Sequence, residues 1–144
     1  MTTLDRGSIL RVWLPLVLGL YALSFVFLHG PGPRDTARWV GLALCLTGLS
    51  GVILARYTLG RSFSIAAKAT QLVTTGIYSR IRNPIYVSGV IFIAGLIVMV
   101  RRPLLGLILV IIIPMQILRA RREAQVLEAK FGDAYRRYRD RTWF

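Results

Sequence analysis

The stretch from Gly76 to Tyr86 gathers small, aromatic, basic and helix-starting residues in a chain that is otherwise largely apolar. Asn83 suits the N-cap position and Pro84 suits the first turn of a helix, so this pair predicts that a helix begins here. The free N–H groups and the positive dipole end of such a helix favour an anion such as a carboxylate or phosphate. Tyr78 and Tyr86 can stack on a flat ring or form hydrogen bonds with it. The stretch is therefore a candidate binding site, and the alternative is a plain helix start with interfacial tyrosines.

Arg119 and Glu123 form a second candidate site, because residues four apart share one face of a helix. An acid at this place can hold a cationic amine while the helix start at Asn83 holds an anion. An α-amino acid group offers both charges, so the two sites together suit such a ligand. The alternative is a solvated ion pair, which contributes little to stability.

The composition indicates a membrane protein of one domain, residues 1–144. The chain is 55% hydrophobic with a mean hydropathy of +0.58, which is too apolar for an ordinary soluble domain of this size. The basic residues behind its net charge of +13 lie between and after apolar runs, so anionic lipid headgroups explain them better than nucleic acid does. Membrane lipids are thus expected partners, and nucleic acid is not. Cys45 and His29 are the only residues of their types, so we expect no internal disulfide and no metal site.

Four apolar runs predict an all-α fold, a polytopic membrane protein with about four transmembrane helices and a C-terminal cytoplasmic helix. The expected helices cover approximately residues 9–28, 37–56, 84–100 and 103–131, and Gly132 is expected to end the last of them. The apolar parts of the third and fourth helices have 16 residues each, or about 24 Å, so they need flanking turns to cross a core of about 30 Å. The second helix carries small residues suited to close packing in lipid: Gly41, Gly48, Ser50 and Gly51.

The distribution of basic residues predicts the orientation in the membrane. Five lie in the segment 56–83 and eight in the tail from Arg119, against two in each of the other two loops. Under the positive-inside rule, that segment, the tail and both termini face the cytoplasm. The stretch from Gly76 to Tyr86 and the side chain of Glu123 are therefore expected on the same side of the membrane, where they can meet.

Three motifs, taken together and in this order, resemble the isoprenylcysteine carboxyl methyltransferase family, whose C-terminal half is shared by related phospholipid methyltransferases. They frame two apolar segments and cover about half of the chain, from near Thr70 to Tyr138. The motifs are the stretch from Leu72 to Tyr78, the turn from Arg82 to Tyr86, and the series Arg119, Glu123, Leu127, Phe131, Gly132, Tyr135 and Tyr138.

The resemblance implies an integral membrane enzyme, of the bacterial inner membrane, that transfers a methyl group from S-adenosyl-L-methionine to a lipophilic acceptor. The acceptor would be an isoprenylcysteine-like carboxylate or a related membrane substrate. The family's substrate-contacting arginine falls on Arg119, and no catalytic residue is assigned. The family's cofactor contacts fall on Thr70, Gln71, Leu72, Val73, Tyr78, Asn83, Pro84, Ile85, Tyr86 and Glu123.

The chain departs from the family pattern at two places in these motifs. The family often has His where this chain has Asn83. A helix cap or a backbone contact survives that change, but a role for an imidazole proton does not. The second of two adjacent acids in the last helix is replaced by Ala124.

Two other functions stay open. A sterol-type membrane reductase has a similar Pro-x-Tyr turn and would use NADPH, although such enzymes are usually much longer. A non-enzymatic small membrane protein, such as a transporter or an assembly factor, is the second. The apolar segments contain no acid, which argues against proton-coupled or cation-coupled transport.

Overall fold

The computed structural model describes residues 6–30, 35–59 and 72–144, and about 85% of these residues are helical, with no strand among them. The described elements follow in the order α1 (Arg6–His29), α2 (Thr36–Leu59), the 3-10 helix η2 (Gly76–Ser79), α3 (Pro84–Val100), the 3-10 helix η3 (Pro103–Gly106), α4 (Leu107–Phe131) and α5 (Asp133–Asp140). The ends of α1 and α2 lie within three residues of the predicted limits. The predicted range 103–131 is divided between η3 and α4.

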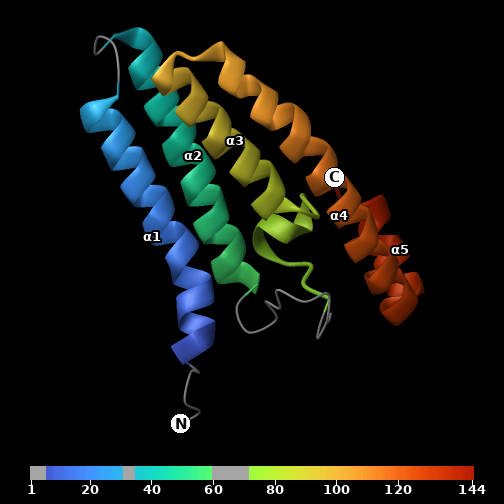
Figure 1. Cartoon of the computed structure of the whole chain (residues 1–144). Coiled ribbons are helices and arrows are strands. Elements are labelled where there is room, and N and C mark those ends of the chain that lie inside the picture. The colour runs from blue at the N-terminus through green and yellow to red at the C-terminus, as the bar shows by residue number, and fades with distance from the viewer. Residues whose placement is uncertain (1–5, 31–34, 60–71) are drawn as a thin grey trace.

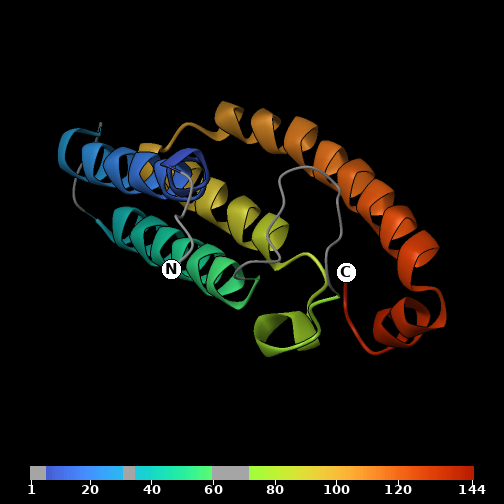
Figure 2. The ribbon, with the colours of Figure 1, turned by 90° about the horizontal axis from the view of Figure 1, so that it is seen from below.

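Helices α1, α2 and α3 run side by side, and α3 lies between α2 and α4 (Figure 1). Seen from below, α4 diverges from the other three helices, and α5 turns back beside its end (Figure 2). The end of α2, the start of α3 and the second half of α4 therefore share one end of the bundle. The candidate site lies at this end.

The closest helix pair is α2 and α3, because both helices present small residues to each other. A Cβ added to Gly48 would lie 2.6 Å from the main-chain nitrogen of Phe92 and 2.6 Å from the carbonyl oxygen of Ser88. A Cβ on Gly95 of α3 would lie 2.7 Å from the carbonyl oxygen of Gly41. Since these glycines lack side chains, the two backbones can approach closely, which is how helices gain contact in lipid.

The buried core lies between α1, α2 and α3. Its centre is formed by Leu23, Cys45 and Met99, one from each helix. Partly buried apolar side chains surround this centre: Val26, Phe27, Leu42, Phe92 and Leu96. In α4, which is described throughout, Ala120 is the only buried residue. The fourth helix is thus held by its ends and by a narrow contact with α3.

Large apolar side chains cover the outer surface of α4, among them Leu107, Val110, Ile111, Met115 and Leu118. An exposed apolar surface of this extent marks contact with a membrane or with another molecule. By length and composition, α2 and the segment Pro103–Phe131 can each cross a membrane, whereas α3 and the apolar part of α1 (Leu16–His29) are shorter. The described residues thus support two of the four expected spans.

Arg38 ties the start of α2 to the end of α1, although it is almost completely buried. Its Nη2 donates to the carbonyl oxygen of Gly30 at 2.6 Å and its Nη1 to that of Phe27 at 3.3 Å. Asp35 forms an ion pair with Arg101, which follows the last residue of α3. These polar contacts fix the three helices at the end of the bundle opposite the start of α3.

Candidate functional site

A hydrogen-bonded cluster joins the first turn of α3 to the middle of α4. The phenol of Tyr86 donates to Glu123 Oε1 at 2.6 Å, and Arg119 Nε donates to the same oxygen at 3.3 Å. The guanidinium carbon of Arg119 lies 5.9 Å from the centre of the Tyr86 ring, within cation–π range. The hydrogen bond from Tyr86 is short because its acceptor is a carboxylate. Three side chains that the sequence singled out in separate segments therefore meet at one place.

Glu123 keeps binding capacity in this cluster. Its side chain is 36% exposed and that of Arg119 is 58% exposed, so a ligand can reach both. Both hydrogen bonds fall on Oε1, and within the described residues Oε2 accepts none. A carboxylate has about four acceptor positions. An ammonium group can therefore bind to Oε2 while the contacts with Tyr86 and Arg119 remain.

Tyr78 lies next to this cluster, buried in the short helix η2. Its carbonyl oxygen accepts a hydrogen bond of 2.8 Å from the phenol of Tyr138 in α5. Burial raises the pKa of Tyr78 above its ordinary value, and the charges of Tyr138 and Glu123 add to this effect. Burial also raises the pKa of Tyr138 to about 12, Tyr135 adds to this, and Arg82 opposes it. Both phenols are neutral at physiological pH, so the Tyr78 ring offers a neutral aromatic surface beside Glu123.

Gly76 positions η2 against the end of α2. Its φ of +58° lies in the left-handed region that side chains disfavour. A Cβ at this position would also lie 2.9 Å from Cγ2 of Thr58 in α2. Both observations require glycine here, so the turn that delivers Tyr78 depends on this residue.

The start of α3 differs from the expected cap. Asn83 occupies the N-cap position, but its side chain makes no capping hydrogen bond. Instead, the N–H groups of Arg82 and Asn83 donate to the carbonyl oxygen of Phe144 at 3.0 and 3.1 Å. Pro84 is fully buried, and the N–H of Ile85 has no backbone partner among the described residues. Arg82 and Asn83 thus donate to the tail, Pro84 has no N–H, and Tyr86 donates to the carbonyl oxygen of Asn83, so the N–H of Ile85 is the donor left at this helix start.

The residues 142–144 form a strap along the stretch before α3. Trp143 N donates to the carbonyl oxygen of Arg80 at 2.7 Å, and the Trp143 carbonyl oxygen accepts from Arg82 N at 3.1 Å. Ile81 and Trp143 pair as an isolated parallel bridge. Sequence reasoning missed this strap, because backbone hydrogen bonds leave no residue pattern. The aromatic pair at positions 143 and 144 was the one available signal.

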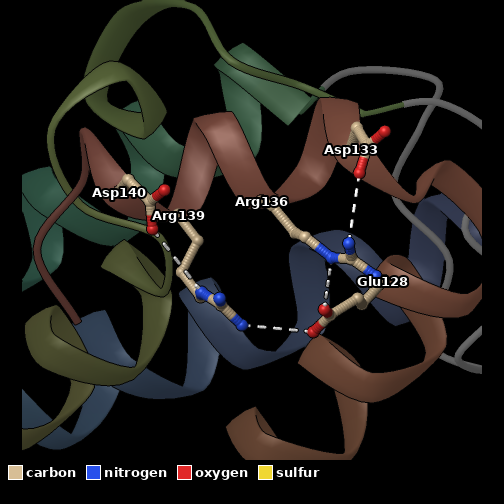
Figure 3. A network of polar contacts seen from close by, with 5 residues as sticks. All are labelled: Glu128, Asp133, Arg136, Arg139 and Asp140. Atoms are coloured by element: carbon tan, nitrogen blue, oxygen red, sulfur yellow. Dashed lines mark hydrogen bonds and ion pairs between the residues drawn. The ribbon is translucent and has the colours of Figure 1, made fainter.

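A network of ion pairs fixes α5 against the end of α4 (Figure 3). Glu128 accepts from Arg136 Nε at 3.0 Å and from Arg139 Nη1 at 3.2 Å. Arg136 also reaches Asp133 at 3.2 Å, and Arg139 lies 3.9 Å from Asp140. Each exposed pair contributes little energy alone. Together they link α5 to the end of α4 on its exposed side.

The remaining predicted site residues lie before η2. Leu72 and Val73 are half-buried in a stretch without regular secondary structure, whereas Thr70 and Gln71 lie outside the described residues. Leu72 lines a cavity of about 520 Å³ together with residues of α5. Within the described parts of the chain, no group of three or more His, Cys, Asp or Glu residues is placed to hold a metal ion.

Comparison with known proteins gives one family and one relative. The sequence model of the phospholipid methyltransferase family matches residues 36–134, which is more than half of the chain. The nickel-cobalt-cadmium resistance protein NccN of Alcaligenes xylosoxydans xylosoxydans is 42% identical over 62 residues. This match covers 40% of the chain and 28% of that protein, so the chain spans less than a third of the curated relative's length. No solved structure matches the chain.

Proposed function

The chain belongs to the phospholipid methyltransferase family, and from this premise we propose that it transfers a methyl group from S-adenosylmethionine to a lipophilic acceptor. Family membership indicates a methyltransferase of lipid-type substrates, and the apolar helices indicate a membrane protein. The observation that carries the finer proposal is the cluster of Tyr86, Glu123 and Arg119 at the junction of α3 and α4.

The cluster suits the amino acid end of S-adenosylmethionine, which carries an ammonium and a carboxylate. The ammonium would bind Glu123 Oε2, which is accessible and accepts no hydrogen bond from the described residues. The carboxylate would meet the N–H of Ile85 between Pro84 and Tyr86, at the positive end of the α3 dipole. One carboxylate and one helix start thus recognise the two opposite charges.

The rest of the cofactor would lie toward η2. The neutral ring of Tyr78 can contact the adenine or the methyl region. Leu72 and Val73 precede it in the chain, and we assign them to the same site together with Thr70, Gln71 and Asn83. This assignment follows the family pattern.

The cofactor supplies an electrophilic methyl group on a positively charged sulfur. Transfer needs alignment of the nucleophile, the methyl carbon and the sulfur, and exclusion of water, so the protein need not supply a strong acid or base. Arg119 would orient a carboxylate or phosphate of the acceptor, because its side chain is more than half exposed and its guanidinium lies at the cluster. If the acceptor is a carboxylate, no proton has to be removed.

The position of the site suits reactants from two phases. Tyr86 lies in the first turn of α3, where an apolar helix begins. A water-soluble cofactor can therefore enter from the aqueous side while the acceptor enters from the bilayer. We assign the site, both termini and the segment 56–83 to the cytoplasmic face of a bacterial inner membrane, on the basis of their basic residues.

Equilibrium binding of labelled S-adenosylmethionine to the purified protein tests this proposal. Glu123→Gln removes the acceptor charge, and Glu128→Gln is a matched control on the same helix with a similar exposure of 33%. Hydrogen bonds to charged groups contribute about 1.5–3 kcal/mol, so we expect Glu123→Gln to weaken binding at least tenfold. The control is expected to bind as the wild type does.

Two results would refute the assignment. One is a wild-type protein that binds no S-adenosylmethionine, and the other is equal binding by the Glu123→Gln variant. Protection from proteolysis by NADPH, without protection by S-adenosylhomocysteine, would favour a membrane reductase instead.

A further inference from the structure

A cavity of about 520 Å³ lies between the stretch before α3 and the C-terminal helix α5. Its polar lining comes from Thr74 and Ser79 on one side and from Arg137, Arg141 and Thr142 on the other. The residues of the Tyr86–Glu123–Arg119 cluster do not line it. The cavity is therefore separate from the proposed ammonium site.

The charge in this cavity is not neutralised by the described protein. Arg137 of α5 and Arg141, the C-cap residue directly after this helix, both line the cavity. Within the described chain neither arginine takes part in an ion pair, whereas Arg136 and Arg139 of the same helix are paired with acids (Figure 3). The cavity lining contains no carboxylate. Two guanidinium groups facing a space without an acid favour an anionic ligand.

Of the three Ser and Thr hydroxyl groups in the lining, one can donate to an anion. Ser79 and Thr142 donate to the carbonyl oxygens of Gly76 and Tyr138 at 2.7 and 2.8 Å. The hydroxyl of Thr74 has no partner among the described residues, so it can donate to a ligand. Guanidinium groups bind both carboxylates and phosphates through paired hydrogen bonds, and a phosphate has more oxygen atoms to share between two arginines and a hydroxyl.

The position of the cavity points to a lipid as the source of the phosphate. Thr142 is followed by Trp143, which pairs with Ile81 three residues before α3 begins at Pro84. The side chain of Trp143 is 66% exposed, and exposed tryptophans are enriched at the level of lipid headgroups. The strap therefore holds the cavity beside the entry of an apolar helix into the membrane, where lipid phosphates are concentrated.

We propose that Arg137 and Arg141, with the hydroxyl of Thr74, bind the phosphate of an anionic phospholipid headgroup. The bound lipid would hold α5 and the strap at the membrane surface. The inference does not depend on methyl transfer, since it uses none of the residues assigned to S-adenosylmethionine other than the neighbouring Leu72.

Native mass spectrometry of the delipidated full chain in detergent tests the proposal. The probes are phosphatidylglycerol, phosphatidylcholine and soluble glycerol phosphate. We compare the wild type with Arg137→Gln/Arg141→Gln and with the control Arg121→Gln/Arg122→Gln, which removes the same charge from exposed positions of α4. We expect tighter binding of phosphatidylglycerol than of phosphatidylcholine by the wild type. The cavity variant should lose at least tenfold in affinity for phosphatidylglycerol, and the control less than twofold.

A charge-preserving variant distinguishes binding through paired hydrogen bonds from nonspecific electrostatic attraction between the arginines and the phosphate. Arg137→Lys/Arg141→Lys keeps both charges but cannot form paired hydrogen bonds, so its affinity should fall severalfold. Equal losses in the cavity variant and the control would overturn the proposal, as would full affinity in the lysine variant. Displacement of phosphatidylglycerol by an equimolar amount of glycerol phosphate would overturn the assignment to a lipid. Binding of labelled S-adenosylmethionine is measured on the same samples. A failure of lipid binding can then be distinguished from a failure of the proposed methyltransferase function.

Discussion

Replacing Gly48 with alanine is expected to separate α2 from α3 and to lower the stability of the protein. The new Cβ would lie 2.6 Å from the main-chain nitrogen of Phe92, 2.6 Å from the carbonyl oxygen of Ser88 and 2.9 Å from the Phe92 Cα. These are backbone atoms, so no side-chain rotation relieves the contact. The gap has to widen from 2.6 Å to about 3.4 Å, where ordinary van der Waals contact begins. Overpacking of this kind costs about 1–3 kcal/mol.

Thermal unfolding in detergent measures this effect, and Gly89→Ala on α3 is the matched control. A Cβ at Gly89 meets nothing within 4 Å, and alanine is preferred over glycine inside a helix by about 0.5–1 kcal/mol. We expect Tm to fall by several degrees for Gly48→Ala and to stay equal or rise for Gly89→Ala. A Gly48→Ala protein as stable as the wild type, or equal losses in both variants, would refute the packing described for α2 and α3.

The C-terminal region gives two further predictions. Tyr138→Phe removes the hydrogen bond to the Tyr78 carbonyl oxygen and should lower the free energy of unfolding by about 0.5–1.5 kcal/mol, measured by thermal unfolding near neutral pH. Burial raises the pKa of Tyr138 from its ordinary value of 10.0 to about 12. The stabilisation that the Tyr138 phenol contributes is therefore complete below pH 10 and is lost as the pH rises through 12. A difference in Tm between the wild type and Tyr138→Phe that stays constant over this pH range would contradict the stated burial. Gly132 lies between α4 and α5 at a φ of +49°, so Gly132→Ala should lower the stability of the fold by about 1–3 kcal/mol, which faster proteolysis of the tail would reveal. The control Gly106→Ala, at an ordinary φ of −59°, should change the proteolysis rate little.

The helices could be predicted from the sequence because their signals are local. Long apolar runs define α2 and the Pro103–Phe131 segment, Asn83 and Pro84 mark the start of α3, and Gly132 follows α4. The small residues of α2 also predicted a close helix contact, and Gly41 and Gly48 do pack against α3. Each of these features depends on residue types within one segment.

The number of membrane spans was less accessible to prediction. Among the described residues, α2 and the Pro103–Phe131 segment qualify as spans by length and composition, whereas Leu16–His29 of α1 and the 17 residues of α3 are shorter apolar segments. Nor does a sequence show that α4 packs so little against the other helices that Ala120 is its one buried residue. Such facts depend on how whole helices cross, which no local pattern encodes.

Contacts between distant segments were the hardest part of the site to predict. Charge patterns indicated that Tyr86 and Glu123 face the same side, but the distance of 2.6 Å depends on how α3 and α4 meet. The strap at Trp143 could not be expected, because it is held by main-chain hydrogen bonds. The strap also takes the N–H of Asn83, so the helix start offers fewer free donors than the sequence suggested.

The central claim is that the cluster at Glu123 serves methyl transfer from S-adenosylmethionine to a membrane-borne acceptor. Membranes that contain the protein can be incubated with methyl-tritiated S-adenosylmethionine and then extracted with organic solvent. The account predicts label in the organic phase for the wild type and for Glu128→Gln, and at least tenfold less for Glu123→Gln. Label no higher than in membranes without the protein, or equal label for Glu123→Gln and the wild type, would contradict it.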